Sequence, residues 1–337
     1  RTRSATSRVS RIFRSEAVKP GDRVVVRRQR GDHASDVIGH VIGTDPLVIR
    51  PQAVGGLPSQ APAIEITEPR IVRRLSPRTV RNSDIRAIET ASAKAFPGSE
   101  HLLIDGWLAR AATEPAPRSN SATPIGHSAG FAPMPLAPLA SFYAGRGAPV
   151  QLLVPERIGK PAQRLIDAAP EKWRLGGELL VMSAELAEGA FDADPRVVLD
   201  EAPHPQWLAM CRYRGRDLSP AEAHDLVSPI DGQLRFARLV QHAGASSEPA
   251  TAAVARVAVT TSEDGRRWLG VSAVEAGERW RRQANGSKLV ESILAWGAAA
   301  GVDAAYVQVQ ASNEAAVAMY GKLGFIEHHR HRYARLG

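Results

Sequence analysis

The chain of 337 residues is 44% hydrophobic and 23% charged and carries a formal net charge of +8 at pH 7. Its length exceeds that of one typical core, so two or three domains are expected, and no apolar stretch approaches the roughly 20 residues that cross a bilayer. The single cysteine, Cys211, excludes an intramolecular disulfide and a multi-cysteine zinc site. We expect a soluble, cytoplasmic protein with no membrane partner.

The positive surplus lies at the start of the chain. Residues 1–30 contain ten Lys and Arg against Glu16 and Asp22, so residues 31–337 are formally neutral. An Arg-rich arm can hold nucleic-acid phosphates by counterion release. A solvated tail is the commoner explanation, the Arg/Ser-rich start also weakly resembles a transit peptide, and no apolar core of a secretory signal follows it. We expect residues 1–18 to be a basic flexible tail.

Residues 19–76 carry short apolar runs separated by Gly, Asp and Pro. Such runs are typical of strands joined by tight turns. Several of them within about 60 residues favour a small SH3-like β-barrel. No aromatic groove accompanies them, so we expect a packing or spacer role. The expected strands are residues 23–27, 37–43, 47–50, 64–66 and 71–72.

Residues 78–190 and 191–337 show the same order of elements. Each has a helix, a glycine turn, a short apolar strand, a second helix and a further strand, which indicates an internal repeat. We interpret the first stretch as a degenerate copy of the second. A helix over residues 78–96, ending before Pro97, begins the first copy. Its other elements are expected at residues 107–111, 118–125, 139–144, 150–154, 161–169 and 179–186, and those of the second at 287–300, 305–309, 313–323 and in a strand ending at Arg335.

The second copy also has apolar runs ahead of its first repeated helix. They predict strands over residues 234–240, 254–259 and 268–274, with a hairpin turn at residues 263–265. Strands and helices that alternate in this way predict an α/β (α+β) fold, a mixed sheet with flanking helices.

A loop of small and cationic residues enters the helix after the last of these strands. Backbone N–H groups at a helix N-terminus bind phosphates well, provided that small side chains let the phosphate approach. Ala284, Gly286 and Ser287 are small, and Arg281 and Arg282 add positive charge. The helix behind them has one apolar face, formed by Leu289, Val290, Ile293 and Leu294.

A second segment, residues 313–325, has the pattern of a short capped helix. Asn313 stands where an N-cap belongs and Gly324 where a left-handed C-terminal residue belongs. Met319 and Tyr320 lie on its apolar face. Tyr320 is either a core tyrosine whose hydroxyl needs a partner or a general acid beside a leaving group.

Together the two segments resemble the signature of the GNAT superfamily of N-acetyltransferases. Residues 281–286 are similar to its coenzyme A loop, and residues 313–325 to its N-x-x-A-x-x-L-Y-x-K-L-G-F segment. Ala284 departs from a glycine of that loop and Met319 from a leucine. The resemblance is specific over residues 254–337. Over its whole length the chain looks like a bacterial GNAT subgroup with an SH3-like start, some members of which are linked to N-acetylglutamate synthesis.

The resemblance implies a tandem of a degenerate and an active GNAT unit that uses acetyl-CoA as co-substrate. The first copy lacks the loop and a counterpart of Tyr320, so it is expected to wall in the acceptor pocket. The methyl group of Ala284 is tolerated if that residue has a negative φ, and Asn285 can take the left-handed geometry that a glycine would otherwise provide. The implied acetyl-CoA contacts are Arg281, Arg282, Gln283, Ala284, Asn285, Gly286, Ser287, Asn313 and Tyr320, with the backbone N–H groups of Val274 and Ala276 against the thioester carbonyl.

The family chemistry is direct attack of an amine on the thioester, with Tyr320 as general acid. Glu275 and Glu278 are candidate bases, or else carboxylates that counter neighbouring arginines. Nothing near Cys211 marks it as an acyl carrier. We expect no metal, because strand alternation would place His329 and His331 on one face and His328 on the other, as surface or pocket-lining residues.

We therefore expect an N-acetyltransferase that acts on a primary amine of a small molecule or peptide, such as the amino acid glutamate. A protein lysine acetyltransferase is one alternative. A regulator that senses acyl-CoA or binds nucleic acid through the basic arm is another. The pattern fixes neither the acceptor nor the oligomeric state.

Overall fold

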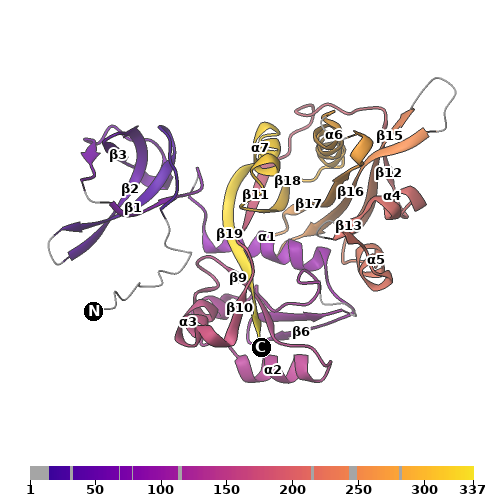
Figure 1. Cartoon of the computed structure of the whole chain (residues 1–337), viewed down its shortest axis with the longest axis horizontal. Helices are drawn as coiled ribbons and strands as arrows, with labels where there is room; N and C mark the ends of the chain where they lie inside the picture. Colours follow the sequence, from indigo (N-terminus) through magenta and orange to yellow (C-terminus); the bar gives the residue numbers. More distant parts are fainter. Residues whose placement is uncertain are drawn as a thin grey trace, which may run out of the picture. The chain divides into compact units, whose positions relative to one another are not determined.

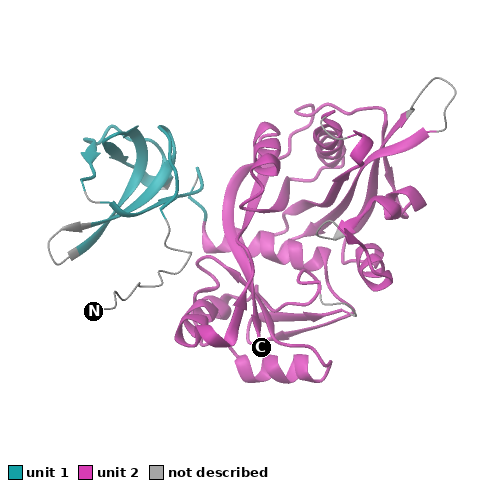
Figure 2. Ribbon diagram, viewed as in Figure 1, with its two compact units in different colours: residues 1–80 teal, residues 81–337 magenta. Residues whose placement is uncertain are grey.

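The computed structural model describes residues 15–30, 33–67, 69–77, 79–112, 116–213, 216–242, 249–280 and 283–337. They belong to two compact units, Arg1–Val80 (unit 1) and Arg81–Gly337 (unit 2), which Figure 2 colours separately. Most of the expected basic tail lies outside the described residues. Among the helices described here, none is long and apolar enough to cross a membrane.

Unit 1 is an antiparallel sheet in the order β4-β3-β2-β1-β5. Val24 and Val26, alternate residues of β1, are fully buried and meet Val41 and Ile49 in a core of their own. β2 changes register with β3 between Val41 and Gly43, and such a bulge bends a strand. The expected short strands are therefore present, although β2 is longer than expected. The strands are β1 Arg23–Arg30, β2 His33–Thr44, β3 Leu47–Pro51, β4 Ile64–Glu65 and β5 Pro69–Arg74.

Unit 2 is built on a long mixed sheet in the order β10-β19-β11-β18-β17-β16-β15-β12, with β9 also paired to β19 (Figure 1). Both faces of its central strands are buried. Leu269 and Val271 of β17 pack with Ile293 of α6, whereas Trp268 packs with Ile88 of α1, so these helices cover opposite faces. The sheet strands are β9 Gln151–Pro155, β10 Trp173–Leu175, β11 Leu179–Glu185, β12 Val197–Asp200, β15 Gln233–His242, β16 Pro249–Thr261, β17 Arg267–Ala276, β18 Ala304–Gln310 and β19 Ile326–Leu336.

Five helices of unit 2 lie within a few residues of their predicted positions. They are α1 Asn82–Ala95, α2 Leu136–Ala144, α3 Lys160–Ala168, α6 Asn285–Ala299 and α7 Glu314–Lys322. Two further helices are α4 Pro205–Met210 and α5 Pro220–Val227. A small sheet of β6 Glu100–Ile104, β7 Trp107–Ala111 and β8 Thr123–Pro124 and a hairpin of β13 Arg212–Tyr213 and β14 Arg216–Asp217 complete the unit. The helices α4 and α5 and the strands β6 and β12 were not predicted from the sequence.

Strands are shared between the first half of unit 2 (residues 81–190) and the second half (residues 191–337). β11, from the first half, lies between β18 and β19 of the second. In return, the end of β19 pairs with β9 and β10 of the first half, as the yellow strand in Figure 1 shows. His331 is the residue at which β19 changes partners, because it pairs with Leu179 of β11 and Pro155 of β9. The sheet is therefore continuous across both halves.

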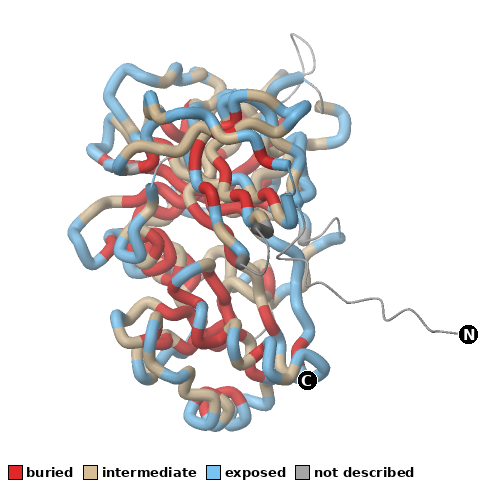
Figure 3. Tube along the Cα trace, turned by 90° about the vertical axis from the view of Figure 1, so that its left-hand side faces the viewer, coloured by how far each residue is buried: buried red, intermediate tan, exposed pale blue. Residues whose placement is uncertain are grey.

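Each half also has its own buried cluster. The core of the first half centres on Trp107, Leu139 and Leu152, all fully buried. The core of the second half lies between α6 and the sheet and includes Leu289 and Ile293. Figure 3 shows these buried segments in red along the strands and helices. The two cores hold the helices in place against the sheet.

Candidate active site

The parallel strands β17 and β18 separate before they end. They pair from Trp268 with Ala304 to Val271 with Val307. Beyond Val271, β17 continues to Ala276 with β16 as its only paired neighbour among the described strands. The backbone of the last part of β17, which includes Val274 and Ala276, is therefore open toward the gap.

A bulge in β17 lies at this point of separation. Val254 of β16 pairs with Glu275, but Arg256 pairs with Ser272, so β17 has one extra residue here. Ala273 within the bulge has a φ of +49°. A bulge of this kind bends the strand. Pairing with β16 resumes at Glu275, so the ladder is interrupted only locally.

The helix α6 begins beside this gap with an unusual residue. Ala284 has φ +57° and ψ 15°, which is left-handed, and the N–H of Lys288 donates to its carbonyl at 3.0 Å. The expectations for this turn were wrong, because Asn285 is helical and Ala284 takes the conformation that favours glycine. Left-handed geometry costs an alanine about 1–2 kcal/mol. Among the described residues no side chain caps the helix, so its first N–H groups are available to an anion.

Asn285 explains how the loop holds this shape. Its side chain is 2% exposed, Nδ2 donates to the Trp280 carbonyl at 3.0 Å, and Oδ1 accepts from Gln241 at 3.4 Å. These bonds fix the start of α6 against β15 and against Trp280, which follows β17. Gln283 is exposed and donates to the Arg279 carbonyl at 3.5 Å. Arg281 and Arg282, the cationic residues of the predicted loop, lie outside the described residues.

Gly286, near the N-terminus of α6, faces Met319 of α7. The nearest atom to a Cβ built on Gly286 is Sδ of Met319 in α7, at 3.9 Å. Nothing in the described protein therefore requires glycine at this position. Glycine here keeps the backbone accessible in the direction of α7, as a phosphate-binding helix start needs. Ser287, the next residue, is half-buried.

The helix α7, which carries Tyr320, begins and ends at the predicted caps. Oδ1 of Asn313 accepts from the Ala316 N–H at 3.1 Å, and Gly324 ends the helix with φ +85°. Tyr320 is 7% exposed and packs edge-on against Phe325, with the ring centres 5.5 Å apart. Its hydroxyl has no hydrogen-bond partner within the described part of the chain. Burial raises the pKa of Tyr320 to about 12, partly offset by the charge of Arg118, so the phenol is protonated near neutral pH.

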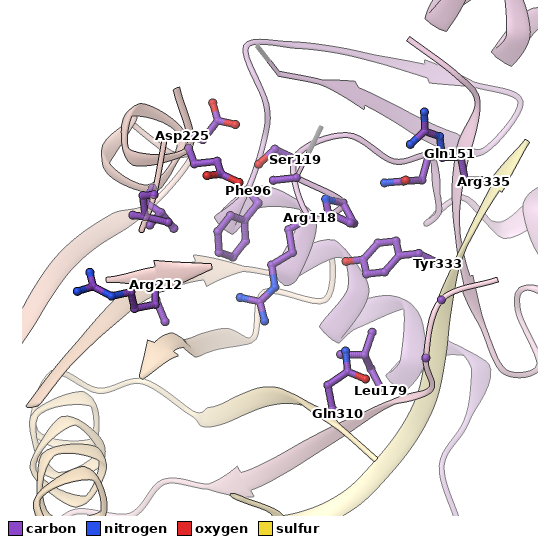
Figure 4. Close-up of a pocket in the computed structure, with 18 of the residues that line it drawn as sticks. Phe96, Arg118, Ser119, Gln151, Leu179, Arg212, Asp225, Gln310, Tyr333 and Arg335 are labelled. Carbon is purple, nitrogen blue, oxygen red and sulfur yellow. The ribbon is translucent and has the colours of Figure 1, made fainter. Parts of the chain in front are cut away.

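A pocket of about 540 Å³ opens at the gap between β17 and β18, where Ala273 and Gln310 line it (Figure 4). Phe96, Arg118 and Ser119 come from the first half, and Glu222, Asp225 and Leu226 come from α5. Arg174, Tyr333 and Arg335 line a further side from β10 and β19.

The segment that carries Arg118 differs from the prediction. A strand was expected over residues 118–125, but the described strand covers only Thr123–Pro124. Oδ1 of Asn120 accepts from the Ala112 N–H at 2.6 Å and holds a turn instead. Buried Arg110 donates to the Phe96 carbonyl at 2.8 Å and to Thr123 at 2.9 Å. Arg110 thus fixes both segments that form this wall.

Glu275, one of the two candidate bases, does not line the pocket. Burial, together with the charge of Glu275, raises the pKa of Cys211 to about 12. Glu275 therefore lies close enough to this thiol to affect it, and Cys211 stays protonated, as expected for a residue that carries no acyl group. Glu278, the other candidate base, is exposed in the short 3-10 turn Glu278–Trp280.

The histidines of β19 were placed wrongly by the sequence analysis. His329 and His331 do share a face, but they are 1% and 2% exposed and both contact Glu89 of α1. Burial raises the pKa of Glu89, yet His331 and His329 outweigh it and hold the pKa below its ordinary range. Glu89 follows Ile85 by one helical turn and so lies on the apolar face of α1. This spacing is the one signal in the sequence that could have predicted a buried acidic residue.

The comparisons with known proteins agree with this geometry. The family described as "Probable histone acetyltransferase Rv0428c C-terminal" matches residues 82–334. The probable histone acetyltransferase Rv0428c of Mycobacterium tuberculosis is 32% identical over 320 residues, which cover 93% of this chain and 94% of the relative. The chain belongs to this family. A GCN5-related N-acetyltransferase from Kribbella flavida has the same fold, with a TM-score of 0.51 at 14% identity over 74% of this chain and 94% of that one.

The chain is thus a GNAT-type acetyltransferase, and enzymes of this fold use acetyl-CoA. The residues present fit that co-substrate. The α6 N-terminus and the absence of a side chain at Gly286 suit a pyrophosphate, and the unpaired edge of β17 beyond Val271 offers backbone N–H groups to a thioester.

The lining of the pocket of this acetyltransferase includes Arg118, Arg174 and Arg335, and also the carboxylates of Glu222 and Asp225. Arg118 lies over the Phe96 ring at 5.4 Å, and Arg174 is directly opposite Arg335 in the β10–β19 register. None of these three arginines has a carboxylate partner within the described ranges. By contrast, the carboxylate of Glu222 is held by Arg216 at 2.6 and 2.8 Å.

Proposed function

We propose that this chain transfers the acetyl group of acetyl-CoA to the primary amine of a small anionic acceptor, such as the amino acid glutamate. The observation that carries the proposal is the set of arginines in the pocket. Arg118, Arg174 and Arg335 lack carboxylate partners among the described residues, although like charges directly opposite one another on a sheet are unfavourable. An acceptor carboxylate would relieve this repulsion.

The proposed donor site is the start of α6 together with the end of β17. The backbone at Gly286 and Ser287 receives the pyrophosphate, and Gln283, Ala284 and Asn285 shape the loop. We infer that Arg281 and Arg282 add charge and that Asn313 orders α7 beside the thioester. The N–H groups near Val274 and Ala276 would hold the oxygen that becomes negative during attack.

The proposed reaction is direct. The acceptor ammonium first loses a proton to solvent, and the neutral nitrogen attacks the thioester carbon. The carbonyl electrons move to oxygen and return as the C–S bond breaks. Tyr320 gives its phenolic proton to the departing sulfur, and the second amine proton then restores the phenol. Glu275 and Glu278 are the candidate bases that pass this first proton to solvent through a water molecule.

A lysine-bearing peptide is the second candidate acceptor, since the relative from Mycobacterium tuberculosis carries a probable histone acetyltransferase name. Histone-like tails are themselves cationic, so the pocket arginines would repel them. A lysine acceptor would instead need an acidic surface. This contrast makes the two candidates easy to distinguish.

The test is a turnover assay that measures thiol release from acetyl-CoA. Glutamate and aspartate are compared with glutamine and asparagine, which have the same shape without the side-chain charge, and with polyamines and lysine peptides. We expect the anionic amino acids to give the highest kcat/KM, and raised salt to reduce it. Preference for lysine peptides, or equal rates with the amides, would overturn the anionic acceptor while leaving the acetyltransferase intact.

A further inference from the structure

A buried polar cluster outside the pocket joins α1 to β19. Oε1 of Glu89 lies 2.8 Å from Nε2 of His329 and 2.7 Å from Nδ1 of His331, and the three side chains are 0% exposed. The candidate ligand atoms all lie within 4.8 Å of one another. His329 and His331 are two residues apart on one strand, so their rings leave the same face.

One carboxylate and two imidazoles form a set of metal ligands that Zn²⁺ and similar cations use. Two imidazoles and one carboxylate hold zinc in several enzymes, and structural zinc sites take four donor atoms. Oε2 of Glu89 is buried and has no hydrogen-bond partner in the described part of the chain, which is unfavourable for a polar atom. A cation bound by both carboxylate oxygens would satisfy Oε2. Both oxygens, Nε2 of His329 and Nδ1 of His331 then supply four donors.

The surroundings of His329 match a metal-bound imidazole. Nδ1 of His329 lies 2.8 Å from Nδ1 of His328. A metal-bound histidine usually donates its other ring N–H to a neighbouring acceptor, which fixes the orientation of the ring. His328 is placed to be that acceptor, leaving Nε2 of His329 unprotonated and aimed at the cluster.

We propose that Glu89, His329 and His331 bind one divalent cation of the zinc class, which fastens α1 to the strand shared by the two halves. His331 is the residue at which β19 passes from β11 to β9, so a cation here would fix that crossing. Donors around a tetrahedral zinc are roughly 3.3 Å apart, so these atoms would separate by about 0.5 Å on binding. Because the cluster is buried, the cation would enter during folding.

The test measures metal in the full-length protein without a metal-binding tag. Protein produced in zinc-supplemented medium is dialysed and its metal content is determined by mass spectrometry; we expect about one zinc per chain. Protein produced with cobalt should show the visible absorption of a tetrahedral Co²⁺ site. Glu89→Gln and His331→Gln should lose the metal, whereas His101→Asn, at an exposed histidine of β6, should keep it.

Wild-type protein decides the proposal even if the variants fail to fold. A zinc content far below one per chain, with no tetrahedral cobalt spectrum, would show that protons alone hold the cluster together and would overturn the proposal. Metal retained at full stoichiometry by soluble Glu89→Gln and His331→Gln would place it elsewhere and overturn it as well. Neither result bears on acetyl transfer, which is assayed separately.

Discussion

A Cβ on Gly286 would stand 3.9 Å from the sulfur of Met319, an ordinary van der Waals distance. The protein itself therefore accepts a methyl group at this position of α6. We expect Gly286→Ala to be more stable than the wild type by about 0.5–1 kcal/mol, because alanine favours the helix. The same methyl group would occupy the proposed pyrophosphate site. Calorimetry should show acetyl-CoA affinity reduced by roughly tenfold or more.

Gly297, in the same helix, provides the matched control. A Cβ there would be 3.0 Å from Leu269 and 3.2 Å from Leu186 in the core. Gly297→Ala should therefore be less stable than Gly286→Ala and should keep its acetyl-CoA affinity. If Gly286→Ala also kept its affinity, the phosphate site could not lie at the start of α6.

Tyr320 should matter for turnover and little for stability. Its hydroxyl makes no hydrogen bond to any described residue, so Tyr320→Phe breaks no hydrogen bond within that part of the protein. Phenylalanine also preserves the packing of the ring. Loss of a general acid reduces rates by about 10²–10⁴-fold. We expect kcat to fall by that order while the KM for acetyl-CoA and the denaturation midpoint change little. Unchanged kcat would exclude the acid role.

Tyr143→Phe should behave in the opposite way. The Tyr143 hydroxyl donates to the Arg110 carbonyl at 3.2 Å inside the first half. Its removal leaves a buried carbonyl without this partner and should cost about 1 kcal/mol in urea unfolding. Acetyl transfer should be retained, because Tyr143 belongs to α2, which contributes neither to the pocket nor to the proposed donor site.

Local signals predicted the two helices of the donor site well. The Asn313 cap, the left-handed Gly324 and the apolar face of α6 all depend on residues a few positions apart. The conformation of Ala284 was not predictable in this way, because alanine normally avoids it. There the bonds of Asn285 to Trp280 and Gln241 override the local preference.

Contacts between residues far apart in the sequence could not be predicted, for a different reason. Glu89 meets His331 across 242 positions of sequence, and no periodicity within α1 or β19 encodes that meeting. The arginine pocket is likewise assembled from β10, β19 and the turn at Arg118. Only the exchange of β11 and β19 between the halves brings these segments together.

Arg118 should contribute to acceptor binding. It has no carboxylate partner among the described residues. Burial raises the pKa of Tyr320, and the positive charge of Arg118 partly offsets that increase. A hydrogen bond to a charged group contributes about 1.5–3 kcal/mol, so Arg118→Gln should raise the KM for an anionic acceptor by roughly 10–100-fold. The KM for acetyl-CoA should stay the same in steady-state assays.

Arg212→Gln is the control, because it also removes one positive charge from the pocket lining. Arg212 also lines the pocket, but its guanidinium is paired with Asp217 at 2.9 Å. Its substitution should change the acceptor KM much less than Arg118→Gln. Equal effects of the two variants would mean that the pocket attracts acceptors only through its overall charge.

Glu222 should make the stability of the α5 wall depend on pH. Hydrogen bonds from Arg216, and also from the Ser219 N–H, outweigh burial and lower the pKa of Glu222 to about 2. A carboxyl whose pKa is depressed in the folded state stabilises above its ordinary pKa of about 4.3 and loses that contribution as pH falls toward 2. Wild-type stability should therefore decline over this range.

The measurement compares urea unfolding of the wild type and Glu222→Gln between pH 6 and about pH 2.5. The wild type should be the more stable protein at pH 6, and the difference should shrink as the pH falls, because glutamine cannot titrate. Arg216→Gln, alone and combined with Glu222→Gln, completes a double-mutant cycle. The coupling free energy should be favourable at pH 6 and small at the acid end. A coupling that did not change with pH would mean that the ion pair to Arg216 is not what stabilises α5.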